Sequence, residues 1–222
     1  MITINGNPIT INGNFISGVD VMIPLPPIQP YTVRAVFTDG TRPGFNVGTK
    51  VQVSTRPNTW DLTYNKSNWD SVLYGNGGML EILDGDLRGV TNLESTFERC
   101  ISLTSVKSLN ISDCTNMYKI FQDCISLVSV PIFDTGNVTS MYQSFFWCTA
   151  LSSIPLFNTS KVTNMTRAFC GCKNVQSGAL ALYQQASTQA TPPRYHYQTF
   201  YNCGSATQTG SAELAQIPSD WK

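Results

Sequence analysis

The residues that could carry out covalent chemistry in this chain are one histidine and seven cysteines. His196 lies seven residues before Cys203 in the sequence. A histidine beside a cysteine can act as the base that activates a thiol nucleophile. The sequence has no G-x-S-x-G turn to present a serine nucleophile. Cys170 and Cys172 do not have the spacing of a C-x-x-C zinc knuckle, and no nearby histidine completes a set of ligands. We therefore assign no catalytic residue and expect neither a metal nor a cofactor.

Carboxylates and glycine-rich turns give no stronger signal for an enzyme. Asp84 and Asp86 flank Gly85, which could suggest calcium, but no glutamate follows at the distance of an EF-hand loop, so a turn is the preferred interpretation. Residues 75–78 lack the third glycine of a dinucleotide fingerprint. The net charge is zero and the sequence shows no lysine and arginine cluster. Neither nucleic acid nor an anionic membrane is therefore expected as a partner.

Aromatic side chains are the better candidates for function, as parts of a binding surface. Tyrosine and tryptophan are enriched among the residues that dominate binding energy, and exposed rings also stack on sugars. The candidate binding residues are Tyr118, Tyr142, Phe146, Trp147, Tyr195 and Tyr197. The ligand expected for them is a protein or a glycan of a host cell surface. An alternative for Trp147 is that its ring fills a gap between neighbouring repeats.

Most of these residues lie on a segment in which one pattern occurs four times at a constant period, at 89–112, 113–136, 137–160 and 161–184. Cysteine, phenylalanine and a long apolar residue recur at fixed places in each copy. The matching positions are Cys100, Cys124, Cys148 and Cys172; Phe97, Phe121, Phe145 and Phe169; Leu93, Met117, Met141 and Met165. Such a fixed period is typical of repeat proteins, in which each copy is stable only when stacked on its neighbours.

Within the third copy, apolar residues at 138, 141, 145 and 148 have the three- and four-residue spacing of one helical face. The apolar residues at 151, 154, 156 and 157 then suggest a loop and a short strand. The predicted fold class is therefore an α/β repeat, a leucine-rich-repeat-like right-handed solenoid preceded by a small β-rich N-terminal unit. The cysteine ladder is interpreted as buried thiols in the core, because a disulfide needs Cα atoms within about 7 Å.

The repeated phrase F-x-x-C-x-x-L-x-x-[VI]-P-x-F-[DN]-T-[GS]-x-V-T-[NS]-M resembles the BspA-type leucine-rich repeat of bacterial surface proteins and of some phage-encoded proteins. One run matches it at Phe121, Cys124, Leu127, Val130, Pro131, Phe133, Asp134, Thr135, Val138, Thr139 and Met141. The resemblance covers residues 89–184. The chain departs from the phrase at Lys107 in the first copy and at Val175 in the last. The resemblance implies a solenoid used for adhesion or protein contact, with no catalytic residues to carry over.

Three regions are expected along the chain. Residues 1–30 form a β leader for attachment or oligomerisation, followed by a proline-rich spacer, and its apolar residues are Ile2, Ile4, Ile9 and Ile11. Residues 31–88 form a β-rich cap, or alternatively a separate β domain with its own ligand. Residues 89–222 form the solenoid with a C-terminal cap.

The function predicted from these features is that of a non-enzymatic structural or adhesion protein, on the surface of a bacteriophage virion as a fibre or as a capsid or tail decoration. The alternative is a secreted or cell-surface bacterial adhesin. Neither a signal peptide nor a transmembrane segment is expected. The expected partners are other virion proteins, bound through the leader, and copies of the same chain, because two short strands are marginally stable alone.

Overall fold

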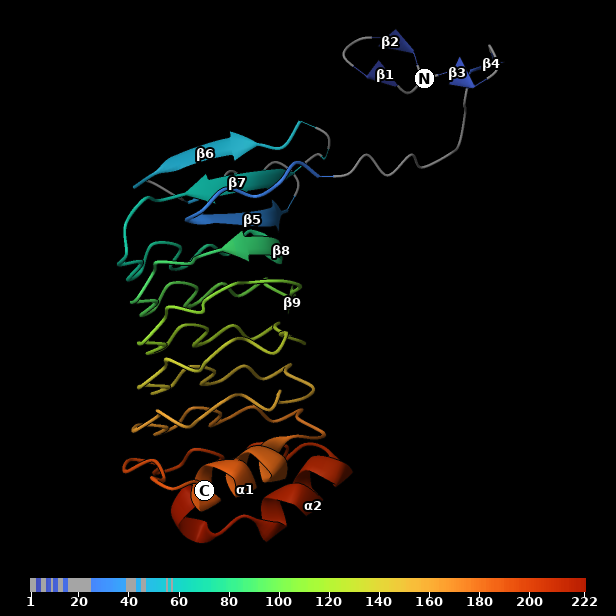
Figure 1. The fold of residues 1–222 in the computed structure, drawn as a ribbon. Helices are drawn as coiled ribbons and strands as arrows, with labels where there is room; N and C mark the ends of the chain where they lie inside the picture. Colours follow the sequence, from blue (N-terminus) through green and yellow to red (C-terminus); the bar gives the residue numbers. More distant parts are fainter. Residues whose placement is uncertain are drawn as a thin grey trace.

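The computed structural model describes residues 25–38, 43–44, 47–54, 56 and 58–222, and before them only the backbone of four two-residue strands (Figure 1). These strands are β1 (Thr3–Ile4), β2 (Asn7–Pro8), β3 (Thr10–Ile11) and β4 (Asn14–Phe15). They pair antiparallel as β1 with β2 and β3 with β4. Each pair therefore flanks one of the two Asn-Gly steps of the leader, as expected of the strongest short hairpin signal.

A mixed five-stranded sheet with the order β6-β7-β5-β8-β9 opens the body of the protein. Its strands are β5 (Thr32–Phe37), β6 (Thr49–Gln52), β7 (Thr59–Thr63), β8 (Met79–Asp86) and β9 (Ser105–Val106). The first four pair antiparallel, whereas β8 pairs parallel with β9, which belongs to the first predicted repeat. The sheet thus continues directly into the repeats.

Arg34 fixes the end of the proline-rich segment to this sheet. Its side chain is 2% exposed, and Nε and Nη2 donate to the two carboxylate oxygens of Asp61 at 2.7 and 2.8 Å. Nη1 donates to the Pro26 carbonyl oxygen at 2.7 Å. A bidentate pair of this kind has a fixed geometry, so the chain is anchored at Pro26 before it enters β5.

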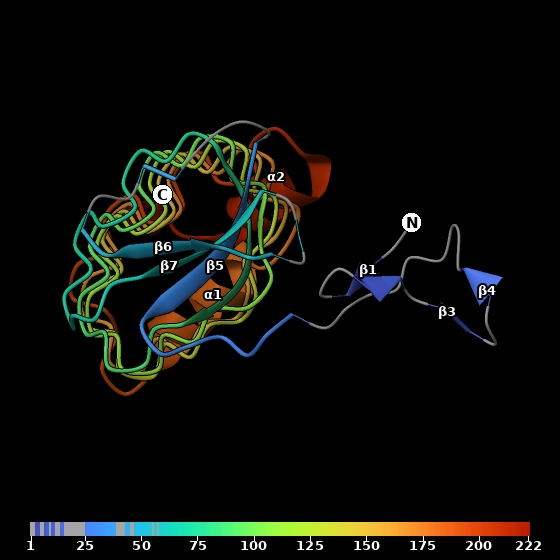
Figure 2. The same cartoon turned by 90° about the horizontal axis from the view of Figure 1, so that it is seen from above.

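Below the sheet, equivalent residues of successive repeats lie against one another, and we call residues 67–204 the repeat stack. Figure 2 looks down this stack and shows the turns of chain superposed. Isolated parallel bridges link Asn68, Asn92, Asn116, Ser140, Asn164 and Tyr195 in that order. The stack therefore begins one repeat earlier than the sequence indicated, because residues 67–88 form a turn of chain above residue 89. The last step, from Asn164 to Tyr195, is longer than the others because it contains an insertion.

The predicted α/β repeat and right-handed solenoid of the leucine-rich-repeat kind is wrong. From residue 25 onward, the described part of the chain has as regular structure the five-stranded sheet, two α-helices, α1 (Ala179–Thr188) and α2 (Gln208–Gln216), and one short 3-10 helix. Residues 138–148, which had the spacing of a helical face, form turns instead of a helix. The four apolar residues that defined this spacing are nevertheless buried.

Two left-handed residues in each repeat explain why no helix forms there. The first copy has positive φ at Ser95 and Arg99, and the second at Lys119 and Asp123. A right-handed helix needs negative φ at every residue, so a residue with positive φ interrupts it. The backbone N–H of each of these residues donates to a carbonyl oxygen of the next repeat, as Arg99 does to Gln122 at 2.8 Å. The hydrogen bonds that a helix would keep within itself therefore hold neighbouring repeats together.

A column of phenylalanine rings forms the centre of the stack. Phe97, Phe121, Phe145, Phe169 and Phe200 are buried, and successive ring centroids lie 5.2, 5.5, 5.2 and 5.9 Å apart with nearly parallel planes. A single cluster of buried residues runs from the sheet to the C-terminal end. The residues that recur in each repeat of the sequence thus form one continuous hydrophobic core.

The C-terminal end of the stack is closed by α1, α2 and a 3-10 helix, η1 (Ser219–Trp221). The Trp221 carbonyl oxygen accepts the Phe200 N–H at 2.9 Å, the bond that a further repeat would make, and the indole lies 6.3 Å from the Phe200 ring. Glu213 of α2 accepts the Leu180 N–H at the start of α1. The first backbone N–H groups of a helix have no partner within the helix and need such an acceptor. The C-terminal end of the stack is thus covered by a lid built around Trp221.

The cysteine ladder is buried, and all seven cysteines, which lie in the described part of the chain, are free. The Sγ atoms of Cys124, Cys148 and Cys172 donate to carbonyl oxygens of the preceding repeat at 3.0 to 3.1 Å. Burial raises the pKa of the Cys100 and Cys114 thiols to about 12 and that of the other five above its usual value. These thiols are therefore protonated core groups.

The raised thiol pKa predicts a loss of stability in alkaline solution. In the unfolded chain a thiol ionises near its ordinary pKa of 9.0, whereas folded Cys100 and Cys114 stay protonated up to about 12. The contribution of these two thiols to the free energy of unfolding is complete below pH 9. It is lost as the pH rises from there, by about 1.4 kcal/mol per pH unit for each thiol. Urea denaturation across this range measures it. The variant with both cysteines changed to alanine should show a shallower fall, and an identical slope would contradict the assignment.

Candidate functional site

Tyr118 and Tyr142 occupy the same place in consecutive repeats and form a stacked pair. Their ring centroids lie 4.7 Å apart at an interplanar angle of 8°, and the backbone N–H of Lys119 donates to the Tyr142 carbonyl oxygen at 2.9 Å. Both side chains are half-buried. Because each ring covers one face of the other, neither tyrosine offers both of its ring faces to a ligand. The structure thus brings these two predicted site residues together.

Phe146 and Trp147 extend the aromatic surface beside this pair. Phe146 is half-buried, and Trp147 is 44% exposed with its ring tilted against Phe146 at 6.1 Å. Gly171 of the next repeat lies under the indole, since a Cβ atom there would be 3.2 Å from Trp147 Cδ1. The indole thus fills a gap between repeats, as the alternative interpretation held, and still leaves nearly half of its surface exposed.

Tyr195 and Tyr197 continue the surface on the last turn of the stack. They are 52% and 60% exposed, and Tyr195 lies below Asn164 while the Tyr197 carbonyl oxygen accepts the Arg167 N–H. Tyr201, 46% exposed, lies in the same way below Gly171, whose N–H donates to its carbonyl oxygen. Tyr201 was not among the candidate residues chosen from the sequence. Its alignment with Phe146 and Cys170, through the lengthened last repeat, is the signal that could have found it.

Each of four rings on this surface carries a basic side chain. The distances from the cationic group to the ring centroid are 5.2 Å for Lys119 over Tyr118, 5.9 Å for Arg167 over Tyr197, 5.4 Å for Lys173 over Trp147 and 5.3 Å for Arg194 over Tyr195. Such contacts are favourable because the ring face is electron-rich. We call the seven aromatic residues and these four basic residues the cation–aromatic face. Basic side chains were not among the residues predicted from the sequence.

His196 is not part of this face, although it lies between two of its tyrosines. Its imidazole stacks on the Trp221 indole with centroids 4.3 Å apart and an interplanar angle of 9°. Its Nδ1 atom is buried without a hydrogen-bond partner. The ring is therefore packed in the C-terminal lid, where it contributes to closing the stack.

The acidic pair around Gly85 is engaged in local contacts. The Asp86 carboxylate accepts from Arg88 Nη2 at 2.7 Å, and this hydrogen bond holds the pKa of Asp86 below its usual value. Asp84 accepts the Gly85 N–H at 2.9 Å. Residues 84–86 belong to strand β8 and pair with β5, so the turn expected there from the sequence is wrong. Among the described residues, no group of three histidine, cysteine, aspartate or glutamate side chains could hold a metal ion.

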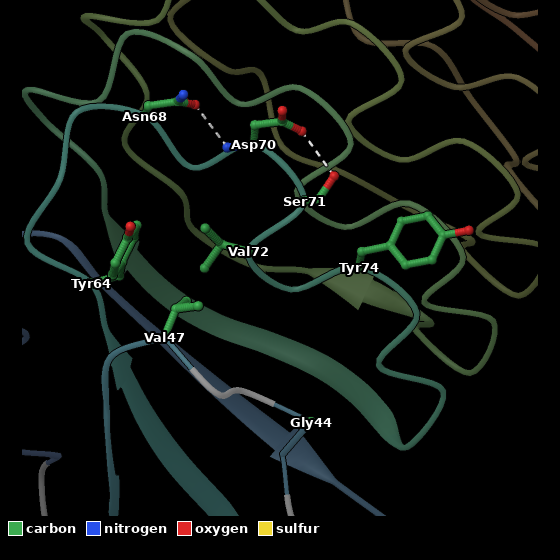
Figure 3. Close-up of a pocket in the computed structure, with 8 residues that line it drawn as sticks. All are labelled: Gly44, Val47, Tyr64, Asn68, Asp70, Ser71, Val72 and Tyr74. Atoms are coloured by element: carbon green, nitrogen blue, oxygen red, sulfur yellow. Dashed lines mark hydrogen bonds between the residues drawn. The ribbon is translucent and has the colours of Figure 1, made fainter.

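A depression of about 400 Å³ lies where loops of the sheet meet the first turn of the stack (Figure 3). Figure 3 labels its lining residues as Gly44, Val47, Tyr64, Asn68, Asp70, Ser71, Val72 and Tyr74. Ser71 Oγ donates to the Asp70 carboxylate at 2.8 Å, and the Asp70 N–H donates to Asn68 Oδ1. Its polar groups thus bond one another, and we place the candidate site on the cation–aromatic face.

Part of the predicted attachment leader lies outside the described residues. This holds for Ile2 and Ile9, and of Ile4 and Ile11 the structure describes the backbone alone. The predicted role of these four residues therefore stays a prediction. Among the described helices, none combines the length and apolar character needed to cross a membrane.

Comparison with known proteins adds one similarity. Residues 76–183 match a family described as "Mycoplasma protein of unknown function, DUF285". The match runs from the turn before β8 into α1 and so covers most of the repeat stack. Its description assigns no function and lends no support to the virion and adhesion terms derived from the sequence. Searches of curated proteins and of solved structures find no match.

Proposed function

We propose that this chain is a non-enzymatic binding protein that contacts its ligand through the cation–aromatic face. The observation that carries the proposal is the series of partly exposed rings along the stack, from Trp147, which is 44% exposed, to Tyr197, which is 60% exposed. Rigid aromatic side chains provide large contact areas at low entropic cost. The backbone below them is already bonded between repeats, so this surface is pre-organised, which reduces the cost of binding.

The setting proposed for this binding is the outside of a virus particle, with a bacterial cell surface as the alternative. Support comes from the few charged residues, 13% of the chain, and from the resemblance to BspA-type repeats. Detection of the chain in purified particles would decide between them.

Assembly of several copies is also proposed, because β6 ends the sheet with all four residues exposed, and an open edge can pair with another chain. Light scattering of the purified chain measures this.

Removal of two exposed rings tests the binding proposal. The variant Trp147→Ala with Tyr197→Ala is expected to bind intact cells from a panel of bacterial species at least about tenfold more weakly than the parent chain, since single hot-spot residues each contribute about 2 kcal/mol or more. The measurement is cell-associated fluorescence of the labelled full chain as a function of its concentration.

The matched control removes two exposed apolar side chains outside the face. Ile132 and Leu156 are 72% and 51% exposed, and the variant with both changed to alanine should bind as the parent chain does. Equal binding by all three chains, with unchanged thermal unfolding, would contradict a role of the cation–aromatic face.

A further inference from the structure

The ring faces of the cation–aromatic face are occupied in a way that limits which ligand it can take. A neutral sugar binds aromatic residues by stacking on an open ring face, but Tyr118 and Tyr142 stack on each other. Lys173 lies over the Trp147 ring at 5.4 Å, and Arg167 and Arg194 lie over the two exposed tyrosines. A ligand that approaches this surface therefore meets positive charge held on the rings.

This positive charge is not neutralised within the described part of the protein. The ion pairs found there are Arg34 with Asp61, Arg88 with Asp86, Arg99 with Asp123, and Lys107 with Glu81. None includes Lys119, Arg167, Lys173 or Arg194. Glu94 and Glu98 near Lys119 accept hydrogen bonds from the neutral amides of Asn116 and Gln122 and keep their negative charge. Residues 161–204, which carry Arg167, Lys173 and Arg194, contain no acidic residue, so this part of the face is locally basic although the chain has no net charge.

The backbone of the stack restricts the ligand further. The N–H groups of Lys119 and Arg167 donate to carbonyl oxygens of the next repeat at 2.9 and 3.0 Å. A peptide therefore cannot add to this side as a strand and can bind through side chains alone. The four cations are spread over more than one turn of the stack, so a long polymer that carries many anionic groups can contact several of them at once. Hydroxyl and amide side chains between the cations, such as Thr166 and Gln198, suit a sugar backbone.

We propose that the cation–aromatic face binds an acidic polysaccharide, with Lys119, Arg167, Lys173 and Arg194 contacting its anionic groups. This inference rests on the proposed function, because it names the ligand class of the same surface. Binding should weaken as sodium chloride is added, since salt screens exposed charges.

The probes are dextran sulfate, neutral dextran of the same length and poly-glutamate, each titrated against the full chain by calorimetry. Dextran sulfate should bind, neutral dextran should not, and poly-glutamate should bind more weakly than dextran sulfate. The variant Lys119→Gln with Lys173→Gln should lose at least about tenfold in affinity for dextran sulfate, from two cations near a dense anionic surface. The control Lys50→Gln with Lys66→Gln removes the same charge elsewhere and should lose about twofold or less.

Three outcomes would overturn this proposal: equal binding of both dextrans, tighter binding of poly-glutamate, or equal losses in the two lysine variants. The first two would leave the proposed binding function intact if the Trp147 and Tyr197 variant still fails to bind cells. If that variant binds cells normally, the proposed function itself fails. The two failures are therefore distinguishable.

Discussion

Replacing Phe121 with alanine is expected to lower the free energy of unfolding by about 3–5 kcal/mol, as large truncations in a packed core do. Phe121 is fully buried, and its ring stacks on Phe97 at 5.2 Å and on Phe145 at 5.5 Å. The change leaves a cavity and also removes these two ring contacts and a third with Phe133 at 6.1 Å, each worth about 0.5–1.5 kcal/mol. Because domains of this kind are stable by about 5–15 kcal/mol in total, urea denaturation should reveal a large shift of the midpoint.

An exposed side chain of the same turn of chain provides the control. Ile125 is 46% exposed, and Ile125→Ala should change the free energy of unfolding by about 0.5 kcal/mol. Phe121→Leu should fall between the two because it refills much of the cavity. A loss of similar size in all three variants would show that the phenylalanine column does not carry the stability of the stack.

Replacing Gly178 with alanine is expected to cost about 3 kcal/mol or more, from backbone strain and atomic overlap together. Gly178 precedes α1 with φ of 97°, and a Cβ atom there would lie 2.1 Å from the carbonyl oxygen of Ile154. Backbone strain of this kind costs about 1–3 kcal/mol, and the overlap adds to it because a backbone carbonyl of the preceding repeat cannot rotate away. Thermal unfolding monitored by circular dichroism measures the loss.

Replacing Gly75 with alanine serves as the control, because it introduces the backbone strain without the atomic overlap. Its φ is 68°, and no atom lies within 4 Å of the position that a Cβ would take. Equivalent residues in the next two repeats, Arg99 and Asp123, adopt φ of 60° and 57° with side chains present. Gly75→Ala should therefore cost about 1 kcal/mol, the conformational term alone. Equal losses at the two glycines would mean that the close approach at Gly178 is relieved at little cost.

The period, the core positions and the strands of the N-terminal sheet could be predicted from sequence. A long apolar side chain, Phe and Cys recur at a constant period, and one face of the chain must bury them, so Met141, Phe145 and Cys148 were correctly expected inside. Residues 31–88 were expected to be rich in β structure, and β5, β6, β7 and β8 lie within them. The earlier turn of chain at 67–88 was missed because Trp69 and Leu73 replace the methionine and phenylalanine of the pattern.

The helix assignment failed because the spacing of apolar residues does not determine the backbone that produces it. Spacings of three and four residues also arise when left-handed residues such as Lys119 and Asp123 fold the chain into successive turns. Whether an N–H group bonds within its own turn or to the next repeat depends on the presence of that neighbour. Because this hydrogen-bond pattern depends on the stacked neighbour, the amino-acid composition of a single repeat does not reveal it.

The candidate site shows the same division. Aromatic residue types alone marked Tyr118, Tyr142 and Trp147, but Lys173 belongs to the repeat after that of Trp147 and meets it only because repeats are superposed. The sequence by itself determined the repeat, its inward-facing residues and the aromatic character of one side. The tertiary structure decided that turns rather than helices carry these residues, because hydrogen bonds between repeats outcompete those within one. It also decided that Trp147 and Tyr197 carry cations, because Lys173 and Arg167 belong to neighbouring turns of the stack and meet these rings only across stacked copies.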